Sequence, residues 1–156
     1  MEENGHFLST PEKSLRNKME YAIGIAAAMA VGIFATVIGF DKERSFYPVV
    51  LIVIGILYLL FAAMASSTDS LVAEAIPALV FVAMAALGFR KTPWFVVAGL
   101  ALHGIFDFFH HALIANPGVP AWWPGWCLAY DVVAAAYLAA LIFIRRTSHA
   151  VAELKR

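Results

Sequence analysis

Residues 46–65 read "FYPVVLIVIGILYLLFAAMA", a run of 20 residues with no charged side chain. A helix needs about 20 predominantly apolar residues to cross the hydrocarbon core of a bilayer, which is roughly 30 Å thick. A helix on the surface of a soluble protein carries a polar face, and this run has no such face. The run therefore predicts a transmembrane helix.

The same pattern occurs four more times along the chain. The predicted spans cover residues 21–40, 46–65, 71–89, 94–115 and 126–144. Short polar or turn-rich loops join them, so neighbouring helices must run antiparallel. Of the 156 residues, 62% are hydrophobic, which is more apolar surface than a soluble domain of this size can bury. We predict an all-α polytopic membrane protein, an up-and-down bundle of five transmembrane helices.

The segments outside the transmembrane domain, residues 21–144, are short. Residues 1–20 are expected to form an outer tail with a short surface helix, in which Thr10 is the cap and Pro11 the first helical residue. Residues 145–156 are expected to form a basic cytoplasmic tail. The first span is too long for a signal-peptide core and has no cleavage site, so we expect it to remain as a helix. The net charge of zero gives no indication of a nucleic-acid partner.

The distribution of Lys and Arg predicts the orientation in the membrane. With five spans, the side that holds the N-terminal tail contains only Lys13, Arg16 and Lys18. The other side contains eight basic residues, which are Lys42, Arg44, Arg90, Lys91, Arg145, Arg146, Lys155 and Arg156. We therefore expect a multi-pass protein of the cell membrane with its N-terminus outside and its C-terminus in the cytoplasm. Three tryptophans at the outer boundary are expected to lie at the headgroup level, namely Trp122, Trp123 and Trp126.

The fourth span carries an unusual set of polar residues in the string "LHGIFDFFHHAL", residues 102–113. Gly99, His103, Asp107 and His111 follow one another at four-residue spacing, and His110 lies three residues after Asp107. On a helix with about 3.6 residues per turn, all of them share one face. Ile105, Phe108 and Phe109 point elsewhere.

Polar residues of two other spans are expected at the same depth. Cys127, Tyr130 and Asp131 lie in the first two turns of the fifth span, and Glu74 lies in the first turn of the third. A charged group that faces lipid costs several kcal/mol, about 2.5–3.5 kcal/mol on insertion scales. We therefore expect these groups to turn toward the bundle interior and to converge.

Three interpretations of this cluster remain open. The polar groups can fix helix packing by hydrogen bonds across the bundle. They can relay protons or ions, as chains of Asp, Glu and His do in transporters. They can also bind a divalent metal, because imidazole and carboxylate are ligands that suit zinc or iron. The predicted metal ligands are His103, Asp107, His110, His111 and Asp131.

A metal at this position would support hydrolytic chemistry. An ion with an open coordination position lowers the pKa of bound water and generates hydroxide at neutral pH. Glu74 and Asp131 are the candidate catalytic residues, because a carboxylate outside the ligand set can act as general base. The substrate would be a lipid or another amphipathic small molecule that enters from the membrane. Membrane lipids are the expected partners, and the sequence does not predict an oligomeric state.

The string H-x3-D-x2-H-H, followed by a Pro-rich loop and by a Cys and an Asp, resembles a family of small bacterial integral membrane proteins of unknown function. The resemblance covers roughly residues 95–135. It implies the inner membrane of a bacterium and no particular activity. The motif positions that it carries over are His103, Asp107, His110, His111 and Asp131. In the family the Cys and Asp are closer together than Cys127 and Asp131, so Cys127 is not carried over.

Two better-understood groups are similar only in part. Membrane fatty-acid desaturases and hydroxylases use H-x2-H-H boxes to hold two irons, but this chain has five histidines, and His6 and His149 lie in the tails. A di-iron site would need carboxylates such as Glu74 as substitutes. Intramembrane ceramidases and adiponectin-receptor hydrolases are similar in placing His and Asp around zinc, although they have seven spans and different spacings.

Two backbone features complete the predictions. Small residues in the first span are expected to form a close-packing seam, namely Gly24, Ala28, Gly32 and Gly39. Pro77 is expected to kink the third span or to end its first turn.

Overall fold

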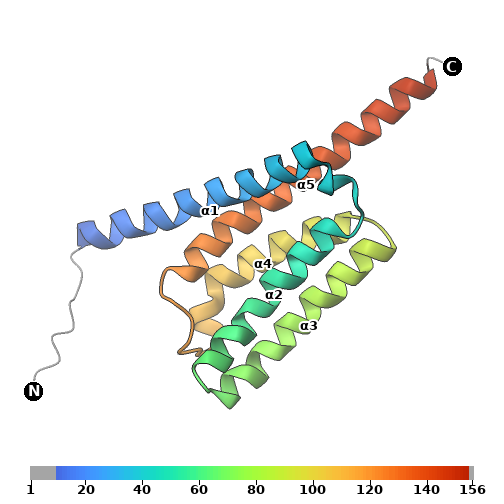
Figure 1. The fold of residues 1–156 in the computed structure, drawn as a ribbon. Helices are drawn as coiled ribbons and strands as arrows, with labels where there is room; N and C mark the ends of the chain where they lie inside the picture. Colours follow the sequence, from blue (N-terminus) through green and yellow to red (C-terminus); the bar gives the residue numbers. More distant parts are fainter. Residues whose placement is uncertain (1–9, 155–156) are drawn as a thin grey trace, which may run out of the picture.

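The computed structural model describes residues 10–154, and the regular structure in this range is entirely helical. The elements are α1 Thr10–Ile38, the short 3-10 helix η1 Phe40–Lys42, α2 Phe46–Met64, α3 Thr68–Arg90, α4 Trp94–Leu113 and α5 Trp123–Leu154 (Figure 1). Each of the five α-helices contains a segment that is long and apolar enough to cross a membrane. The predicted fold class, an all-helical bundle with five such helices, is confirmed.

The outer surface of the bundle is strongly apolar. Large side chains are exposed along the spans, including Val37 at 77%, Met64 at 72% and Phe108 at 66%. Ile105 and Phe109 are also exposed, as their positions on the helix predicted. Soluble proteins rarely expose contiguous apolar surface on this scale. The surface therefore fits a lipid environment.

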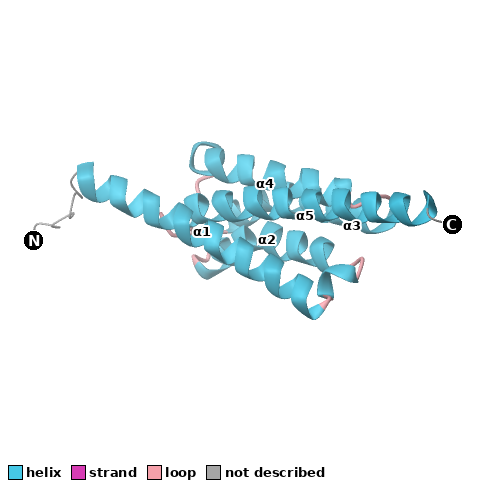
Figure 2. Cartoon of the chain, turned by 90° about the horizontal axis from the view of Figure 1, so that it is seen from above, coloured by secondary structure: helices cyan, strands magenta, loops and turns pink. Residues whose placement is uncertain are grey.

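The helices do not form a symmetric ring. α1 packs chiefly along α5, α5 also packs along α4, and α2 packs along α3, which in turn contacts α4. Figures 1 and 2 show that the first turns of α1 and the last turns of α5 project from opposite ends of the bundle. The interior enclosed by α2, α3, α4 and α5 is where polar side chains can be sheltered from lipid.

The contact between α1 and α5 depends on small residues. A Cβ atom on Gly24 would lie 2.3 Å from the Trp126 carbonyl oxygen, and one on Gly32 would lie 3.0 Å from the Tyr137 ring. Ala28 is buried between them. The predicted seam is thus present at these three positions. Gly39 does not belong to it, because this residue ends α1 with a φ of 89°, in the left-handed region that favours glycine.

The observed helices are longer than the predicted spans at the two ends of the chain. Residues 10–20, which were expected to form a separate surface helix, are the first turns of a continuous α1. Likewise α5 begins at Trp123 and continues through the basic segment to Leu154. Apolar runs mark where lipid begins and ends, whereas a helix can continue into water beyond them. α3 continues through Pro77 without interruption.

Candidate metal centre

Four chemically reactive side chains meet between α4 and α5. One ligand atom from each of His103, Asp107, Cys127 and Asp131 can be chosen so that all four atoms lie within 4.8 Å of one another. All four residues are buried, with exposed fractions of 0–1%. We call these four residues the α4–α5 cluster. It brings together a nitrogen, a sulfur and two carboxylate ligands.

His103 is the central residue of this cluster. Its Nδ1 lies 2.7 Å from Asp131 Oδ2 and 3.2 Å from Asp107 Oδ2. The Cys127 thiol donates a long hydrogen bond of 3.8 Å to the same Asp131 oxygen. The imidazole packs edge-on against the Phe81 ring of α3, with 4.6 Å between the ring centroids. This apolar contact fixes the plane in which the imidazole presents its nitrogen to the carboxylates.

The sequence explains why these residues meet. His103 and Asp107 are one helical turn apart on α4, and Cys127 and Asp131 are one turn apart on α5, so each helix contributes two neighbouring side chains. Gly104 lies at the contact between the two helices, where an added Cβ would be 3.4 Å from Asp131 Cβ. The expected convergence of His103, Asp107 and Asp131 is therefore present.

A second polar group lies between α3 and α4. His110 Nε2 is 2.7 Å from Glu74 Oε1, and both side chains are fully buried. The Asn116 amide donates to the same Glu74 oxygen at 2.9 Å and to the backbone carbonyl of Tyr58 at 3.0 Å. Asn116 thereby ties the loop after α4 to both α2 and α3. Glu74 and His110 form their own pair and are not among the four residues of the α4–α5 cluster.

Tyr58 of α2 connects the two groups. Its hydroxyl donates a 2.7 Å hydrogen bond to Asp107 Oδ1. Its ring stacks on His110, with 4.0 Å between ring centroids and an interplanar angle of 16°. The polar interior is therefore one connected assembly. Hydrogen bonds join Asp131 to His103 and Asp107 to Tyr58, an ion-pair contact joins His103 to Asp107, and an aromatic stack joins Tyr58 to His110.

The structure separates the five sequence-predicted ligands. His103, Asp107 and Asp131 lie in the α4–α5 cluster, whereas His110 pairs with Glu74. His111 is exposed and is not among the four residues whose ligand atoms meet, so the structure does not bring it into the predicted ligand set. Adjacent residues on a helix are about 100° apart, and His110 occupies the inward direction. Cys127, which the resemblance did not carry over, belongs to the cluster.

Several buried polar atoms of this interior have no hydrogen-bond partner within the described part of the chain. They are Glu74 Oε2, His103 Nε2, Asp107 Oδ2, His110 Nδ1 and Asp131 Oδ1. The 3.2 Å contact of Asp107 Oδ2 with His103 is an ion-pair distance without hydrogen-bond geometry. Buried polar groups are normally satisfied, and each exception requires an explanation such as a bound ion or water. These five atoms leave hydrogen-bonding capacity in the polar interior that an ion or water could use.

The charges of the α4–α5 cluster do not balance. Asp107 and Asp131 carry two negative charges when ionised, and His103 can offset only one of them. No Lys or Arg forms an ion pair with either aspartate among the residues described. An uncompensated charge in a medium of low dielectric constant is very unfavourable. The cluster must therefore take up a proton or a cation.

A small cavity leads toward the cluster from the end of the bundle that carries the Trp-rich loop. It has a volume of about 210 Å³ and lies between α1, α4 and the start of α5. Asp107 and His111 both line it, so the exposed histidine stands on the route to the buried carboxylate. The cavity reaches Asp107, whose side chain is itself fully buried.

Two residues of the polar interior were not predicted from the sequence. Tyr58 lies in an otherwise apolar run. Asn116 lies in a loop, where a solvated amide side chain is common. The available signals were weak. Tyr58 is one of only two tyrosines in its span, and Asn116 precedes Pro117, a pairing that is common in turns.

Comparison with known proteins found no matching family model, no similar curated protein and no similar solved structure. The functional argument therefore depends on the geometry and charge of the polar interior.

Proposed function

We propose that this five-helix membrane protein binds a divalent metal ion, with zinc as the first candidate, at His103, Asp107, Cys127 and Asp131. The observation that carries the proposal is the meeting of four buried ligand residues of three types around one point, with an excess of negative charge when both carboxylates are ionised. Zinc is bound by His nitrogen, Cys thiolate and carboxylate oxygen, most often with four ligands in tetrahedral arrangement. Each residue of the cluster belongs to this set.

The distances support the proposal. Ligand bonds of roughly 2.0–2.3 Å in a tetrahedron separate neighbouring ligand atoms by roughly 3.3–3.8 Å. The contact of His103 Nδ1 with Asp107 is 3.2 Å, and that of Cys127 with Asp131 is 3.8 Å. The 2.7 Å contact of His103 with Asp131 would have to lengthen by about 1 Å or less, which small rotations of the two side chains can provide. An ion would then replace the hydrogen bond as the link between these residues.

The carboxylate oxygens that do not bind the metal can accept hydrogen bonds that hold the ligands in place. A carboxylate that binds an ion through one oxygen keeps the other for a hydrogen bond, and such bonds orient the ligands. Tyr58 already makes this bond to Asp107 Oδ1. Replacing Tyr58 with Phe should therefore weaken metal binding, by roughly 10–100-fold for a lost supporting contact, without abolishing it.

A catalytic role has one specific requirement, an open coordination position for water. Four protein ligands fill a tetrahedron, so hydrolysis requires one of the four to be displaced. The cavity beside Asp107 makes this carboxylate the natural candidate to exchange for water or for an amphipathic substrate. Glu74 is poorly placed as general base, because it belongs to the separate pair with His110 and not to the α4–α5 cluster. Asp131 can act as general base only if it does not bind the metal.

Elemental analysis of detergent-purified protein tests the proposal. We expect about one zinc or other transition-metal ion per chain in the wild type, and loss of that ion in His103→Ala and Asp131→Asn. The matched controls are His111→Ala, a histidine of the same helix that is exposed, and Glu74→Gln, which alters the neighbouring pair. Wild-type protein that remains metal-free after growth and purification with added zinc would contradict the proposal.

A proton relay is the second candidate function, and the bridging position of Tyr58 favours it. Its hydroxyl donates a hydrogen bond to Asp107 and its ring stacks on His110, so titratable groups follow one another from Asp131 to Glu74, and a bridging water would have to carry the proton between Asp107 and His110. If the polar interior is a proton relay, Tyr58→Phe should interrupt proton movement whether or not the protein holds a metal. Proton flux into protein-containing vesicles, measured with a pH-sensitive dye, separates this function from metal binding.

We further propose that the C-terminus faces the cytoplasm and the Trp-rich loop faces outward, from the distribution of Lys and Arg. Reporter fusions after Arg156 and within residues 116–125 test this orientation. An alkaline phosphatase fusion that is active at the C-terminus would reverse it.

A further inference from the structure

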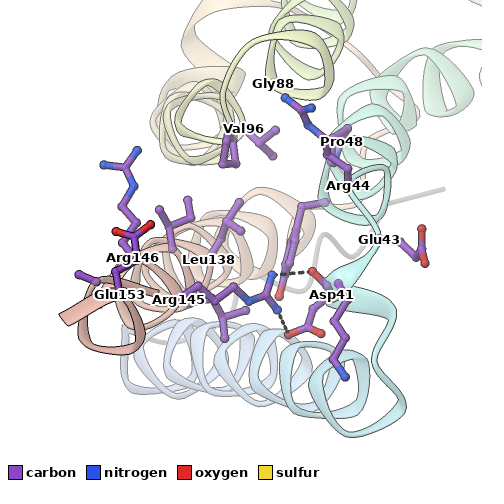
Figure 3. Close-up of a pocket in the computed structure, with 16 residues that line it drawn as sticks. Asp41, Glu43, Arg44, Pro48, Gly88, Val96, Leu138, Arg145, Arg146 and Glu153 are labelled. Carbon is purple, nitrogen blue, oxygen red and sulfur yellow. Dashed lines mark hydrogen bonds and ion pairs between the residues drawn. The ribbon is translucent and has the colours of Figure 1, made fainter. Parts of the chain in front are cut away.

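A second and larger cavity lies at the end of the bundle opposite the candidate metal centre. Its volume is about 590 Å³, within the range of roughly 300–1,000 Å³ that is typical of small-molecule sites. Residues of η1, the start of α2, the loop between α3 and α4, and α5 from Leu138 onward line it (Figure 3). This is the end of the bundle that carries most of the Lys and Arg residues.

The inner walls of this cavity are apolar. They are formed by Pro48, Val96, Leu138, Leu141 and Ile142. Figure 3 shows the side chains of Val96 and Leu138 pointing into the space between α2 and α5. Such a surface can hold a hydrocarbon chain, because the chain gains van der Waals contacts there without exposing any polar group.

One buried polar group in the wall has no partner. Tyr47 is only 7% exposed and lines the cavity, yet its hydroxyl makes no hydrogen bond to any described residue. Leaving a buried hydroxyl unpaired is unfavourable. An oxygen of a bound molecule would satisfy it. This hydroxyl is independent of the polar interior at the other end of the bundle.

The charged residues around the opening favour an anion. Asp41 is neutralised within the protein, because Arg145 forms a 2.8 Å ion pair with it and also donates to its backbone carbonyl. The other charged lining residues are three cations and two anions, which are Lys42, Arg44, Arg146, Glu43 and Glu153. The opening therefore keeps a net positive charge.

The two remaining arginines are placed to bind one head group. Figure 3 shows Arg44 and Arg146 on opposite sides of the cavity, while Glu43 is directed away from it. Arg44 Nη2 donates to the Lys91 carbonyl at 3.3 Å, which leaves its other donors free to contact a ligand. Arginine is well suited to phosphate, because its planar group offers two parallel donors.

We propose that this cavity binds one anionic phospholipid. Its phosphate lies between Arg44 and Arg146, its acyl chain lies against the apolar wall, and Tyr47 donates a hydrogen bond to one of its oxygens. The position supports this occupant over a soluble anion, because the cavity combines a hydrocarbon-binding wall with cations at the end of a membrane-spanning bundle. The proposal does not depend on the metal site.

Native mass spectrometry of delipidated protein in a neutral detergent tests the site. The probe is dioctanoyl phosphatidylglycerol. Dioctanoyl phosphatidylcholine, which carries no net charge, is the control. We expect one tightly bound phosphatidylglycerol per chain and clearly weaker binding of phosphatidylcholine. The double variant Arg44→Gln, Arg146→Gln should weaken phosphatidylglycerol binding by roughly thirtyfold, since each basic residue near a membrane surface contributes about 1 kcal/mol.

The matched control is Arg16→Gln, Arg90→Gln, which removes two exposed arginines that do not line the cavity, and its affinity should equal that of the wild type. A third variant, Ala150→Trp, fills the opening from an exposed position on α5 and should weaken binding without removing a charge. Thermal unfolding of each variant checks that it is folded. Equal binding of the two lipids by the wild type, or unchanged phosphatidylglycerol binding in both the arginine pair and Ala150→Trp, would overturn the proposal.

Discussion

The two halves of the bundle interior are built from different kinds of residue. Toward η1, the buried positions of α2 and α4 are mainly apolar and include Leu51, Val96 and Leu100, each fully buried, while the buried Asp41 of η1 is paired with Arg145. Toward the Trp-rich loop, the buried positions form the polar half, which consists of Tyr58, Glu74, His103, Asp107, His110, Asn116 and Asp131. The apolar half shows that this chain can pack its helices without charged groups. The polar half is therefore an addition that packing alone does not require, and this is the strongest general argument that it serves a function.

Breaking one pair of the polar half should have the largest effect on stability. Glu74→Leu leaves the buried His110 and one Asn116 hydrogen bond without their carboxylate. Breaking a buried pair by removing one partner costs about 3–5 kcal/mol. Unfolding of the detergent-solubilised protein, followed by circular dichroism, measures the loss.

The paired substitution sharpens the comparison of the two halves. Glu74→Leu combined with His110→Leu converts this part of the interior to the apolar type, and replacing a whole buried ion pair by apolar residues is often neutral or stabilising. We expect most of the lost stability to return. A double variant that is as unstable as Glu74→Leu would mean that the pair itself holds the helices together.

A substitution in the apolar half should have a smaller and simpler effect. Leu100→Ala removes a fully buried side chain and leaves a cavity, which costs about 2–5 kcal/mol depending on how far the neighbours relax. Metal content should not change. A loss of bound metal in Leu100→Ala would show that the two halves are not independent.

The seam between α1 and α5 provides a third, weaker test. In Gly32→Leu the new side chain collides with the Tyr137 ring, whose nearest atoms lie 3.0 Å from the added Cβ. Overpacking of this kind costs about 1–3 kcal/mol. Phe108→Leu, on an exposed face, should change stability by only about 0.5 kcal/mol. Thermal unfolding ranks the two variants, and equal tolerance would place the seam elsewhere.

The smallest effect is expected at His111. This residue follows His110 directly but is exposed, so His111→Ala should leave metal content unchanged and stability within about 0.5 kcal/mol of the wild type. Parallel elemental analysis and unfolding measurements check both points. Loss of metal in this variant would mean that the cavity beside Asp107 belongs to the binding site.

The sequence was sufficient for the fold, because an apolar run of about 20 residues has few alternatives to a membrane helix. It also predicted the meeting of His103, Asp107 and Asp131, since the helical period and the cost of exposing charge to lipid act on every span independently. The ends of α1 and α5 were not predicted, because hydropathy falls at the membrane boundary while the helix continues past it.

The partition of the polar residues could not be predicted. The helical period places His110 and His111 close to the same face, and only the packing of α3 against α4 decides that His110 meets Glu74. The roles of Tyr58 and Asn116 depend on contacts between α2, α3 and the loop after α4, which no local pattern encodes. Sequence periodicity gives the direction of a side chain, whereas its partner is a property of the tertiary structure.

Zinc titration of chelator-treated protein, followed by calorimetry, tests the central claim that the α4–α5 cluster is a metal site. We expect one binding event per wild-type chain, accompanied by proton release as the ligands lose their protons, and a rise in the unfolding temperature. Asp131→Asn should retain the fold and lose the binding event. Wild-type protein that neither binds zinc nor gains thermal stability from it, while Asp131→Asn behaves identically, would contradict the account.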